Sequence, residues 1–359
     1  MNRVNKDELL NAVKKTYNAC IENSKFESEM AISLCFSEKE CYVYAENRLI
    51  SIKSFFKTEE LKNTFTCIVK GKDLLNILKC AKEDSVNLEL MQKENKLFIS
   101  SGDAKVYLYT NAIKTFSKES LSLEIEGKCY ADLSKLKEIK HNISSNSDSR
   151  LRSVHLLVGP NGTKLETTDG LNYSIRGKDR GTEFVIEEKF LEIITEIAED
   201  ERIIFFYGKY KNGTDGILIK TNDTEIKLPL EVRKYFSLNP WIFDKDKVPQ
   251  GMGTIKLDRF ELINALNLMG TIADYVEIDI KNNEPLNIKS IGVYGESETL
   301  VDANIQGLWQ ETVASFNIKA MLDSLTSIND KEINLYIKSK SSGIHIIGDD
   351  YYEYLGAVS

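Results

Sequence analysis

Apolar residues recur at helical spacing in three segments that lie far apart along the chain. The segments are 73–90, 189–206 and 319–336, and in each the helical pattern is followed by a polar turn and then a strand pattern. A short strand pattern precedes each of these helices. The strands are Phe65–Val69, Glu183–Ile186 and Thr312–Phe316.

A second amphipathic helix opens each unit. These helices are predicted over Lys6–Asn18, Asp132–Asn142 and Asp258–Met269, with Asp132 and Asp258 as N-caps. Short alternating strands, such as Ala31–Phe36, fill the space between the two helices of a unit. The chain is therefore predicted to be α+β, with one helix–strands–helix–strands unit repeated three times at a period of about 120 residues. We place the three domains at residues 1–120, 121–250 and 251–359.

Composition narrows the class of protein. The 42% hydrophobic and 28% charged residues are typical of a soluble globular chain, and no apolar run reaches membrane-spanning length. The start of the chain leads into a helix pattern rather than an apolar signal segment, so we expect a cytoplasmic protein. The net charge of −8 argues against a uniformly basic nucleic-acid binder, but it leaves room for a local basic surface. The six cysteines form no CxxC pair, and we expect small buried thiols rather than disulfides or a metal site.

No pattern of catalytic residues stands out. The three histidines, His141, His155 and His345, are scattered over the chain, and no HExxH, nucleophile elbow or phosphate-binding glycine loop is present. We therefore expect a non-catalytic protein with no cofactor and no metal. A hydrolase site between domains is the enzyme alternative.

Three sequence segments, taken in order, carry a resemblance to a known family. They are Val69-Lys-Gly-Lys-Asp-Leu-Leu75, Thr167-Thr-Asp-Gly170 and Phe316-Asn-Ile-Lys-Ala-Met-Leu-Asp-Ser-Leu325. With the three repeats, they make the chain similar over its whole length to the bacterial DNA polymerase III beta subunit, the sliding clamp. The resemblance implies three clamp-fold domains that form half of a ring, with helices lining the hole and sheets outside.

In such a ring, two protomers meet head to tail and encircle duplex DNA without reading its sequence. The resemblance implies that an edge strand of domain one meets domain three of the second copy. Val106 and Leu108 lie on that strand, and Ile272 faces it. The alternative is that these three are ordinary core residues.

Lysines on the polar sides of the helices then become candidates for phosphate contacts. A lysine stripe by itself indicates only a solvated face, but a ring that slides on DNA needs cations that do not read bases. The candidates are Lys14, Lys15, Lys25, Lys72, Lys79, Lys82, Lys135, Lys137, Lys140, Arg150 and Arg152.

The resemblance also implies a peptide-binding pocket between domains two and three. By position its residues are Leu151, Thr168, Gly170, Leu171, Asn172, Tyr173, Pro229, Arg233, Asn317, Ala320, Ser341, Gly343, Leu355, Gly356, Ala357 and Val358. The chain departs from the family after Gly170, at Ala320 and in the tail 356–359, so peptide preference is open. The alternative is that the tyrosines near the C-terminus only form a terminal strand.

The predicted function is thus a DNA sliding clamp. It would be a homodimer that tethers the replicative polymerase, is placed by a clamp loader and binds other proteins with clamp motifs. A clamp-like scaffold that binds proteins but does not encircle DNA is the competing interpretation.

Overall fold

The computed structural model describes residues 1–359 apart from 23, 111–122, 140–152, 160–161, 170, 178–181, 199–201, 231–251, 294, 309, 340–341 and 359. Within these limits the chain divides into two compact units. Unit 1 comprises Met1–Tyr130 and Ile193–Val232, and unit 2 comprises Ala131–Glu192 and Arg233–Ser359. The two units are described separately below.

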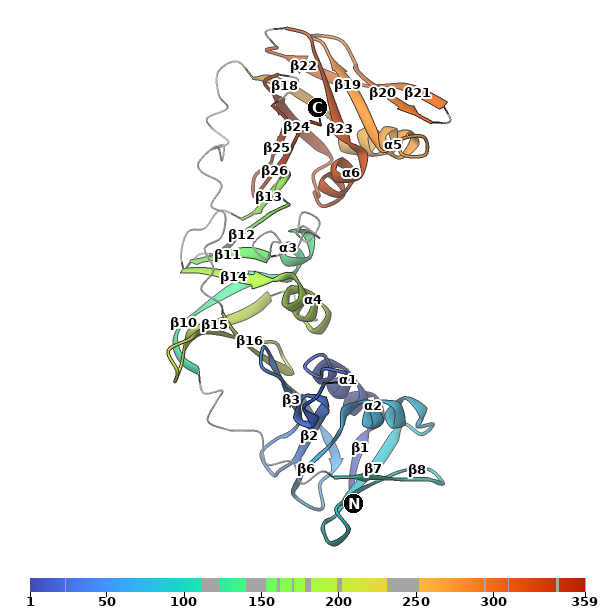
Figure 1. The fold of residues 1–359 in the computed structure, drawn as a ribbon, viewed down its shortest axis with the longest axis vertical. Helices are drawn as coiled ribbons and strands as arrows, with labels where there is room; N and C mark the ends of the chain where they lie inside the picture. The colour runs from blue at the N-terminus through green and yellow to red at the C-terminus, as the bar shows by residue number, and fades with distance from the viewer. Residues whose placement is uncertain are drawn as a thin grey trace. The chain divides into compact units, whose positions relative to one another are not determined.

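The predicted order of helices and strands is confirmed three times along the chain (Figure 1). The six helices of the described residues are Lys6–Tyr17 (α1), Gly71–Cys80 (α2), Leu133–Glu138 (α3), Glu188–Ile197 (α4), Arg259–Met269 (α5) and Ile318–Thr326 (α6). Two 3-10 turns, Glu27–Met30 and Gln92–Glu94, were not predicted. The positions of the three domain boundaries stay a prediction, because the compact units divide the middle repeat between them.

Local sequence explains where the helices begin. Asn5 accepts hydrogen bonds from the amides of Asp7 and Glu8 at the start of α1, and Asp258 accepts from those of Phe260 and Glu261 at the start of α5. The Asp258 cap was predicted. The side chain of Asp132, the other predicted cap, lies outside the described residues.

Unit 1 contains two antiparallel sheets. The five-stranded sheet runs in the order β5 (Thr58–Glu60), β1 (Asn2–Asn5), β7 (Ser85–Met91), β8 (Lys96–Ser101), β9 (Ala104–Tyr109). The eight-stranded sheet runs in the order β10 (Leu123–Asp132), β15 (Arg202–Tyr210), β16 (Asp215–Lys220), β17 (Thr224–Pro229), β4 (Ser51–Phe56), β3 (Cys41–Glu46), β2 (Ala31–Phe36), β6 (Phe65–Lys70). Helices α1 and α2 pack side by side and contact strands of both sheets (Figure 1).

Unit 2 is built in the same way. Its nine-stranded sheet runs in the order β14 (Thr182–Glu187), β11 (Ser153–Gly159), β12 (Gly162–Thr168), β13 (Tyr173–Arg176), β26 (Tyr351–Leu355), β25 (Ile344–Ile347), β24 (Glu332–Ile337), β18 (Gly253–Asp258), β22 (Ala303–Gln306). Its four-stranded sheet runs in the order β21 (Gly295–Val301), β20 (Leu286–Gly292), β19 (Tyr275–Ile280), β23 (Thr312–Asn317). Helices α5 and α6 pack against each other over a core that contains Leu262, Leu266, Phe316 and Leu325.

Two strand pairings join consecutive repeats within one sheet. In the first junction β17 pairs with β4, and Thr224 lies opposite Ser54. In the second junction β26 pairs with β13, and Tyr351 lies opposite Arg176. In both cases the last strand of one repeat pairs with the third strand after the first helix of the repeat before it. The two junctions are therefore copies of one connection.

The thiols largely behave as predicted. Cys35, Cys41 and Cys67 are buried and Cys20 is half-buried, and burial raises the pKa of both Cys20 and Cys67 to about 12. Cys80, at the end of α2, is exposed, so the expectation of burial is wrong for it. The described residues contain no group of three or more His, Cys, Asp or Glu side chains that could hold a metal ion. None of the described helices is long and apolar enough to cross a membrane.

Candidate nucleic-acid and peptide interfaces

The lysines of unit 1 lie on and beside its helix pair. Lys14 on α1 and Lys72 and Lys79 on α2 are exposed, as are the neighbouring Lys25 and Lys82. Lys72 Nζ lies 3.3 Å from Glu22 Oε2, and both of these side chains are more than half exposed. The helix pair thus presents exposed cations, of the kind that can contact phosphates, together with the acidic Glu22.

Lys15 is placed differently from its neighbour. Its side chain is only 7% exposed, and its ammonium lies 2.9 Å from Asp223 Oδ2, in the turn that precedes β17. The expectation that Lys15 shares the polar face of the helix is wrong. The small residues Ala12 and Thr16 are buried on the same side of α1, which contacts β4 closely there. Lys15 therefore lies at the first junction, where it holds the turn of the second repeat.

The second repeat repeats this arrangement. Lys135 on α3 is half-buried, and its ammonium lies 2.8 Å from Asp350 Oδ2, in the turn that precedes β26. The Lys135 ammonium beside Asp350 lowers the pKa of that carboxyl. Lys137 is exposed on the same helix. The remaining candidates, Lys140, Arg150 and Arg152, lie outside the described residues.

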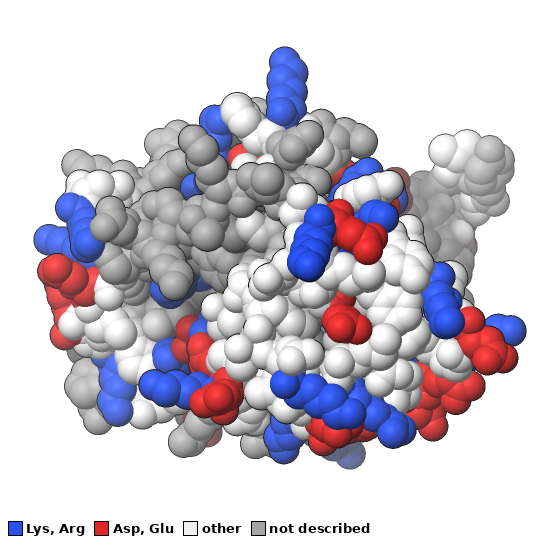
Figure 2. Space-filling model, turned by 90° about the horizontal axis from the view of Figure 1, so that it is seen from below, with Lys and Arg blue, Asp and Glu red and all other residues white. Residues whose placement is uncertain are grey.

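Charges of both signs are interleaved on the face seen in Figure 2. Lysine and arginine side chains stand beside aspartate and glutamate side chains around a largely uncharged surface. This face is not a uniform basic patch, in keeping with the net charge of −8. Any attraction to DNA on it would depend on individual lysines.

The turn between β12 and β13 positions several of the predicted peptide-site residues. Asp169 Oδ1 accepts hydrogen bonds from the amides of Leu171 (2.8 Å) and Asn172 (2.6 Å), and the Thr168 hydroxyl donates to the Asn172 carbonyl at 2.7 Å. This closed turn holds the Leu171 side chain out, 51% exposed. Gly170 lies outside the described residues.

The C-terminal tail continues this site. The amide of Gly356 donates to Asn172 Oδ1 at 3.3 Å, and a Cβ at Gly356 would meet Leu171 Cδ1 at 2.4 Å, so Leu171 packs directly on the glycine. Leu355 is buried beneath, and Tyr173 lies opposite Tyr354 in the sheet. Gly343 has a φ of 70°, which favours glycine, and a Cβ there would lie 2.4 Å from the Leu355 carbonyl.

The start of α6 lies along the same tail. The amide of Val358 donates to the Ser315 carbonyl at 2.9 Å, and two residues further on Asn317 Oδ1 accepts from the amide of Ala320 at 2.9 Å. Ala357 is half-buried against the unit 2 core. The structure therefore brings together nine of the predicted residues, Thr168, Leu171, Asn172, Tyr173, Gly343, Leu355, Gly356, Ala357 and Val358, and places Asn317 and Ala320 beside their tail.

The remaining peptide-site candidates are not part of this group. Pro229 ends β17 in unit 1, where it lines a different cavity. Leu151, Arg233 and Ser341 lie outside the described residues.

A buried ionic cluster beside this site was not predicted. Arg176 on β13 is 2% exposed, and its Nη1 lies 2.6 Å from Oε1 of Glu353, which is fully buried on β26. Ser174 and Ser324 donate to the other Glu353 oxygen, and Arg176 Nη2 donates to Ser327 Oγ at 2.6 Å. An isolated buried charge is costly, so this cluster fixes the side chains at the second junction. No local sequence pattern predicts this cluster, because β13, which carries Arg176, lies far along the chain from α6 and β26, which carry its partners.

Two of the three predicted interface residues lie on the edge strand of a sheet. Val106 and Leu108 are half-buried on β9, the last strand of the five-stranded sheet, and β21 is the last strand of the four-stranded sheet. Ile272 follows α5, and its carbonyl lies so close to Gly292 that a Cβ there would meet it at 2.0 Å. Both edges are open within the part of the chain that the structure describes.

Comparisons with known proteins agree with this fold. Residues 2–140 match the family model for the DNA polymerase III beta subunit, N-terminal domain. No curated protein sequence matches the chain.

Similar solved structures include three bacterial proteins, each under 20% identical in sequence to this chain. A putative DNA polymerase III beta subunit from Eubacterium rectale is 17% identical, with a TM-score of 0.85 over 99% of this chain and 98% of its own. The DNA polymerase sliding clamp of Bacillus subtilis is 18% identical, with a TM-score of 0.82 over 100% and 98%. The DNA polymerase III beta subunit of Thermotoga maritima is 18% identical, with a TM-score of 0.81 over 100% and 99%. The predicted resemblance is thus confirmed: the first 140 residues match the beta-subunit N-terminal domain family, and the whole chain has the sliding-clamp fold.

Proposed function

We propose that this chain is a DNA sliding clamp, a non-catalytic homodimeric ring that encircles duplex DNA and tethers a replicative polymerase. One observation carries the proposal. The junction that joins repeats within the chain is used twice, and strands equivalent to its two halves, β9 and β21, each have one side without a strand partner among the described residues.

The repeat relation between these strands is detailed. β17 begins directly after Asp223, β26 after Asp350 and β9 after Asp103. Strand β21 holds the place in its repeat that β4 and β13 hold in theirs. In a second copy, β21 would therefore pair with β9 just as β4 pairs with β17, which is a head-to-tail contact.

Burial supports the same assignment. The third and fifth residues of the two paired strands are nearly inaccessible: Ile226 and Leu228 on β17, and Glu353 and Leu355 on β26. Their counterparts on β9 are Val106 and Leu108, which are still half-buried. We expect both to become buried in the dimer.

Mass and variants test the ring. We expect light scattering to give twice 40.8 kDa for the chain and 40.8 kDa for Val106→Asp/Leu108→Asp. Lys105→Ser, an exposed position on the same strand, is the matched control and should leave the dimer intact. A monomeric unaltered chain that ignores DNA would instead favour a protein-binding scaffold.

DNA retention tests encirclement. We expect the loaded dimer to stay on nicked circular DNA and to leave after linearisation, because a ring slides off an end. Lys14→Glu/Lys79→Glu/Lys137→Glu should weaken direct binding to a short linear duplex and flatten its salt dependence, whereas Lys209→Glu on β15 should not. Unchanged binding of the duplex by the triple variant would remove these lysines from the interface.

The group around Leu171 is the proposed site for peptides of the polymerase, the clamp loader and other clamp-motif proteins. Leu171→Asp should abolish binding of a clamp-binding peptide in a fluorescence titration without unfolding the chain, since the side chain is half exposed. Equal binding by the variant would exclude this site.

A further inference from the structure

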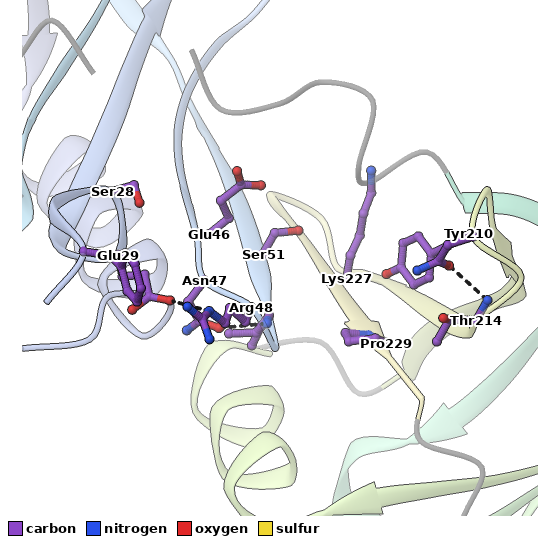
Figure 3. A pocket seen from close by; sticks show the side chains of 13 residues that line it. Ser28, Glu29, Glu46, Asn47, Arg48, Ser51, Tyr210, Thr214, Lys227 and Pro229 are labelled. Carbon is purple, nitrogen blue, oxygen red and sulfur yellow. Dashed lines mark hydrogen bonds and ion pairs between the residues drawn. The ribbon is translucent and has the colours of Figure 1, made fainter. Parts of the chain in front are cut away.

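A cavity of about 420 Å³ lies at the first junction, entirely within unit 1. Its walls come from four segments: the loop before β2, the β3–β4 turn, the β15–β16 turn and the end of β17. Figure 3 shows Glu29, Asn47 and Arg48 on one side and Tyr210, Lys227 and Pro229 on the other. Its volume is within the range of natural ligand sites.

Three of these segments, the β3–β4 turn, the β15–β16 turn and the end of β17, are the repeat counterparts of described segments at the second junction, and the counterpart of the loop before β2 lies outside the described residues. The β3–β4 turn has the same hydrogen bonds as the β12–β13 turn: Asn47 Oδ1 accepts from the amides of Leu49 and Ile50, as Asp169 Oδ1 does from those of Leu171 and Asn172. Ser51 lies opposite Lys227, as Tyr173 lies opposite Tyr354. The cavity therefore occupies, one repeat earlier, the place of the proposed peptide site.

The side chains that fill that place differ between the two junctions. At the second junction the Tyr354 hydroxyl donates to the Ser342 carbonyl at 3.1 Å and Leu171 packs on Gly356. At the first junction the counterpart of Tyr354 is Lys227 and that of Gly356 is Pro229. Asn47 Nδ2 donates to the Ala19 carbonyl at 2.9 Å, whereas Asp169 at the second junction accepts from Asn172 Nδ2.

The polar groups of the cavity define what it would accept. The Tyr210 ring is 6% exposed, and its hydroxyl has no hydrogen-bond partner among the described residues. An unpartnered buried donor is costly and points to a ligand acceptor. The two acids already have partners: Glu46 accepts from the Tyr44 hydroxyl at 2.5 Å, and Glu29 accepts from Ser24 and lies 3.7 Å from Arg48.

Cations supply the complementary charge. Lys227 lies in the cavity wall, and burial followed by the nearby Lys53 and Lys220 lowers the pKa of its ammonium despite Glu225 and Glu46. A carboxylate beside Lys227 would relieve this and could accept from Tyr210 as well. Arg48 extends over the Phe26 ring at 4.7 Å, and Phe26 is 51% exposed at the rim.

We propose that this cavity is a second peptide-docking site, which takes a short segment of a partner protein that carries an apolar side chain next to a carboxylate. The apolar side chain packs against Phe26, Ile50 and Pro229, and the carboxylate accepts hydrogen bonds from Tyr210 and Lys227. The site lies within one unit, so it does not depend on ring closure or on DNA.

Selection from random octapeptides tests the proposal on the full chain. The peptides are displayed on phage, selected on the unaltered protein and counter-selected on Tyr210→Phe/Lys227→Met. We expect enrichment of sequences with an acidic residue next to an aromatic or aliphatic one. Failure to enrich any peptide, or enrichment without an acidic residue, would overturn the proposal.

Anisotropy titrations with an enriched peptide then locate it. Lys227→Met should weaken binding at least about tenfold, the loss typical of one charge-assisted hydrogen bond, and Tyr210→Phe by a smaller factor. Lys220→Met, a neighbouring lysine outside the cavity lining, and Leu171→Asp at the second junction should change affinity less than about twofold, since neither side chain lines the cavity. Binding lost in Leu171→Asp but kept in Lys227→Met would assign the peptide to the second junction and refute the inference. The monomeric Val106→Asp/Leu108→Asp variant should bind with unchanged affinity, which separates this result from failure of the ring.

Discussion

The two junctions have the same strand pairing but different side chains around it. Both pair the same two strands of the repeat over four residues, and in both the carbonyl of the turn aspartate, Asp223 or Asp350, accepts an amide hydrogen bond from the opposite strand. The second junction closes over buried tyrosines and the Arg176–Glu353 pair. The first has Ser54 and Thr224 at the position of Arg176 and Tyr351, and it leaves a cavity.

This difference shows that the strand pairing connects the repeats, whereas the side chains determine whether a junction is closed or contains a cavity. Main-chain hydrogen bonds are indifferent to side-chain identity, so a repeated backbone can be kept while its filling changes. A charged core at one junction and an accessible cavity at the other follow from substitutions at matching positions. Variants at those positions separate the two roles.

The largest contrast is expected at the position shared by Arg176 and Ser54. Arg176→Met leaves Glu353 buried without its cation, and we expect a loss of about 3–5 kcal/mol in the free energy of unfolding. Ser54→Ala removes the hydrogen bond to Thr224 and a long one of 3.5 Å to the Asp223 carbonyl, and should cost about 1 kcal/mol. Urea unfolding of the full chain measures both. The double variant Arg176→Met/Glu353→Leu should recover most of the loss, and no recovery would mean that packing rather than charge dominates.

Acid should loosen the second junction selectively. His345, which contacts the Tyr352 hydroxyl at 2.9 Å, has a pKa lowered by burial to about 4. Since the folded pKa lies below the unfolded value of about 6.5, the stabilisation is complete above pH 6.5 and is lost as pH falls towards 4, with about 2 kcal/mol lost at pH 5. Unit 1 contains no histidine. Urea unfolding at pH 7.5 and pH 5 measures this loss. In His345→Gln the free energy of unfolding should fall between the two pH values by about 2 kcal/mol less than in the unaltered chain. An equal pH dependence in both proteins would contradict the assignment.

For the two lysine–aspartate pairs, we expect the larger loss of stability at the first junction rather than at the second. Asp223→Asn leaves Lys15, 7% exposed, without its carboxylate, and we expect a loss of about 1–2 kcal/mol. Asp350→Asn leaves Lys135, 24% exposed, and should cost less than about 1 kcal/mol because water can reach the ammonium. Thermal unfolding of the two variants gives the comparison. A larger loss for Asp350→Asn would reverse our ranking of the two anchors.

The smallest contrast concerns two tyrosine hydroxyls. Tyr352→Phe breaks the hydrogen bond to His345 and should destabilise the chain by about 1 kcal/mol. Tyr210→Phe removes a hydroxyl with no partner among the described residues, so stability should stay within about 0.5 kcal/mol or rise. Differential scanning calorimetry resolves the two, and a clear loss for Tyr210→Phe would show that its hydroxyl already has a structural partner.

Local patterns predicted the elements well, because helix spacing and caps act over a few residues. Helices α1 and α5 end within one residue of the prediction, and Asp258 caps as expected. Lys15 shows the limit of such patterns: its neighbours indicate a solvated face, but its partner Asp223 lies 208 residues away. The Arg176–Glu353 pair also joins distant parts of the chain, and nothing near either residue in the sequence predicts it.

The two candidate sites could be predicted from the sequence to different extents. The group around Leu171 came from the resemblance, and most of its described members do lie together. The sequence does contain a signal for the cavity at the first junction. Asn47 and Leu49 occupy the same positions in the β3–β4 turn as Asp169 and Leu171 occupy in the β12–β13 turn. Whether such a place is open depends on packing, which the order of residues alone does not specify.

The middle repeat is divided between the two compact units, and this has a consequence for how the chain opens. Because β15, β16 and β17 belong to one sheet and β11, β12 and β13 to another, no repeat can come apart without opening a sheet that it shares with a neighbour. Amide hydrogens across each junction should therefore exchange together, as one cooperative block that extends past the repeat boundary. The structural repeat is then not the unit that fluctuates, and a middle repeat cut out alone would have no cooperative block of its own.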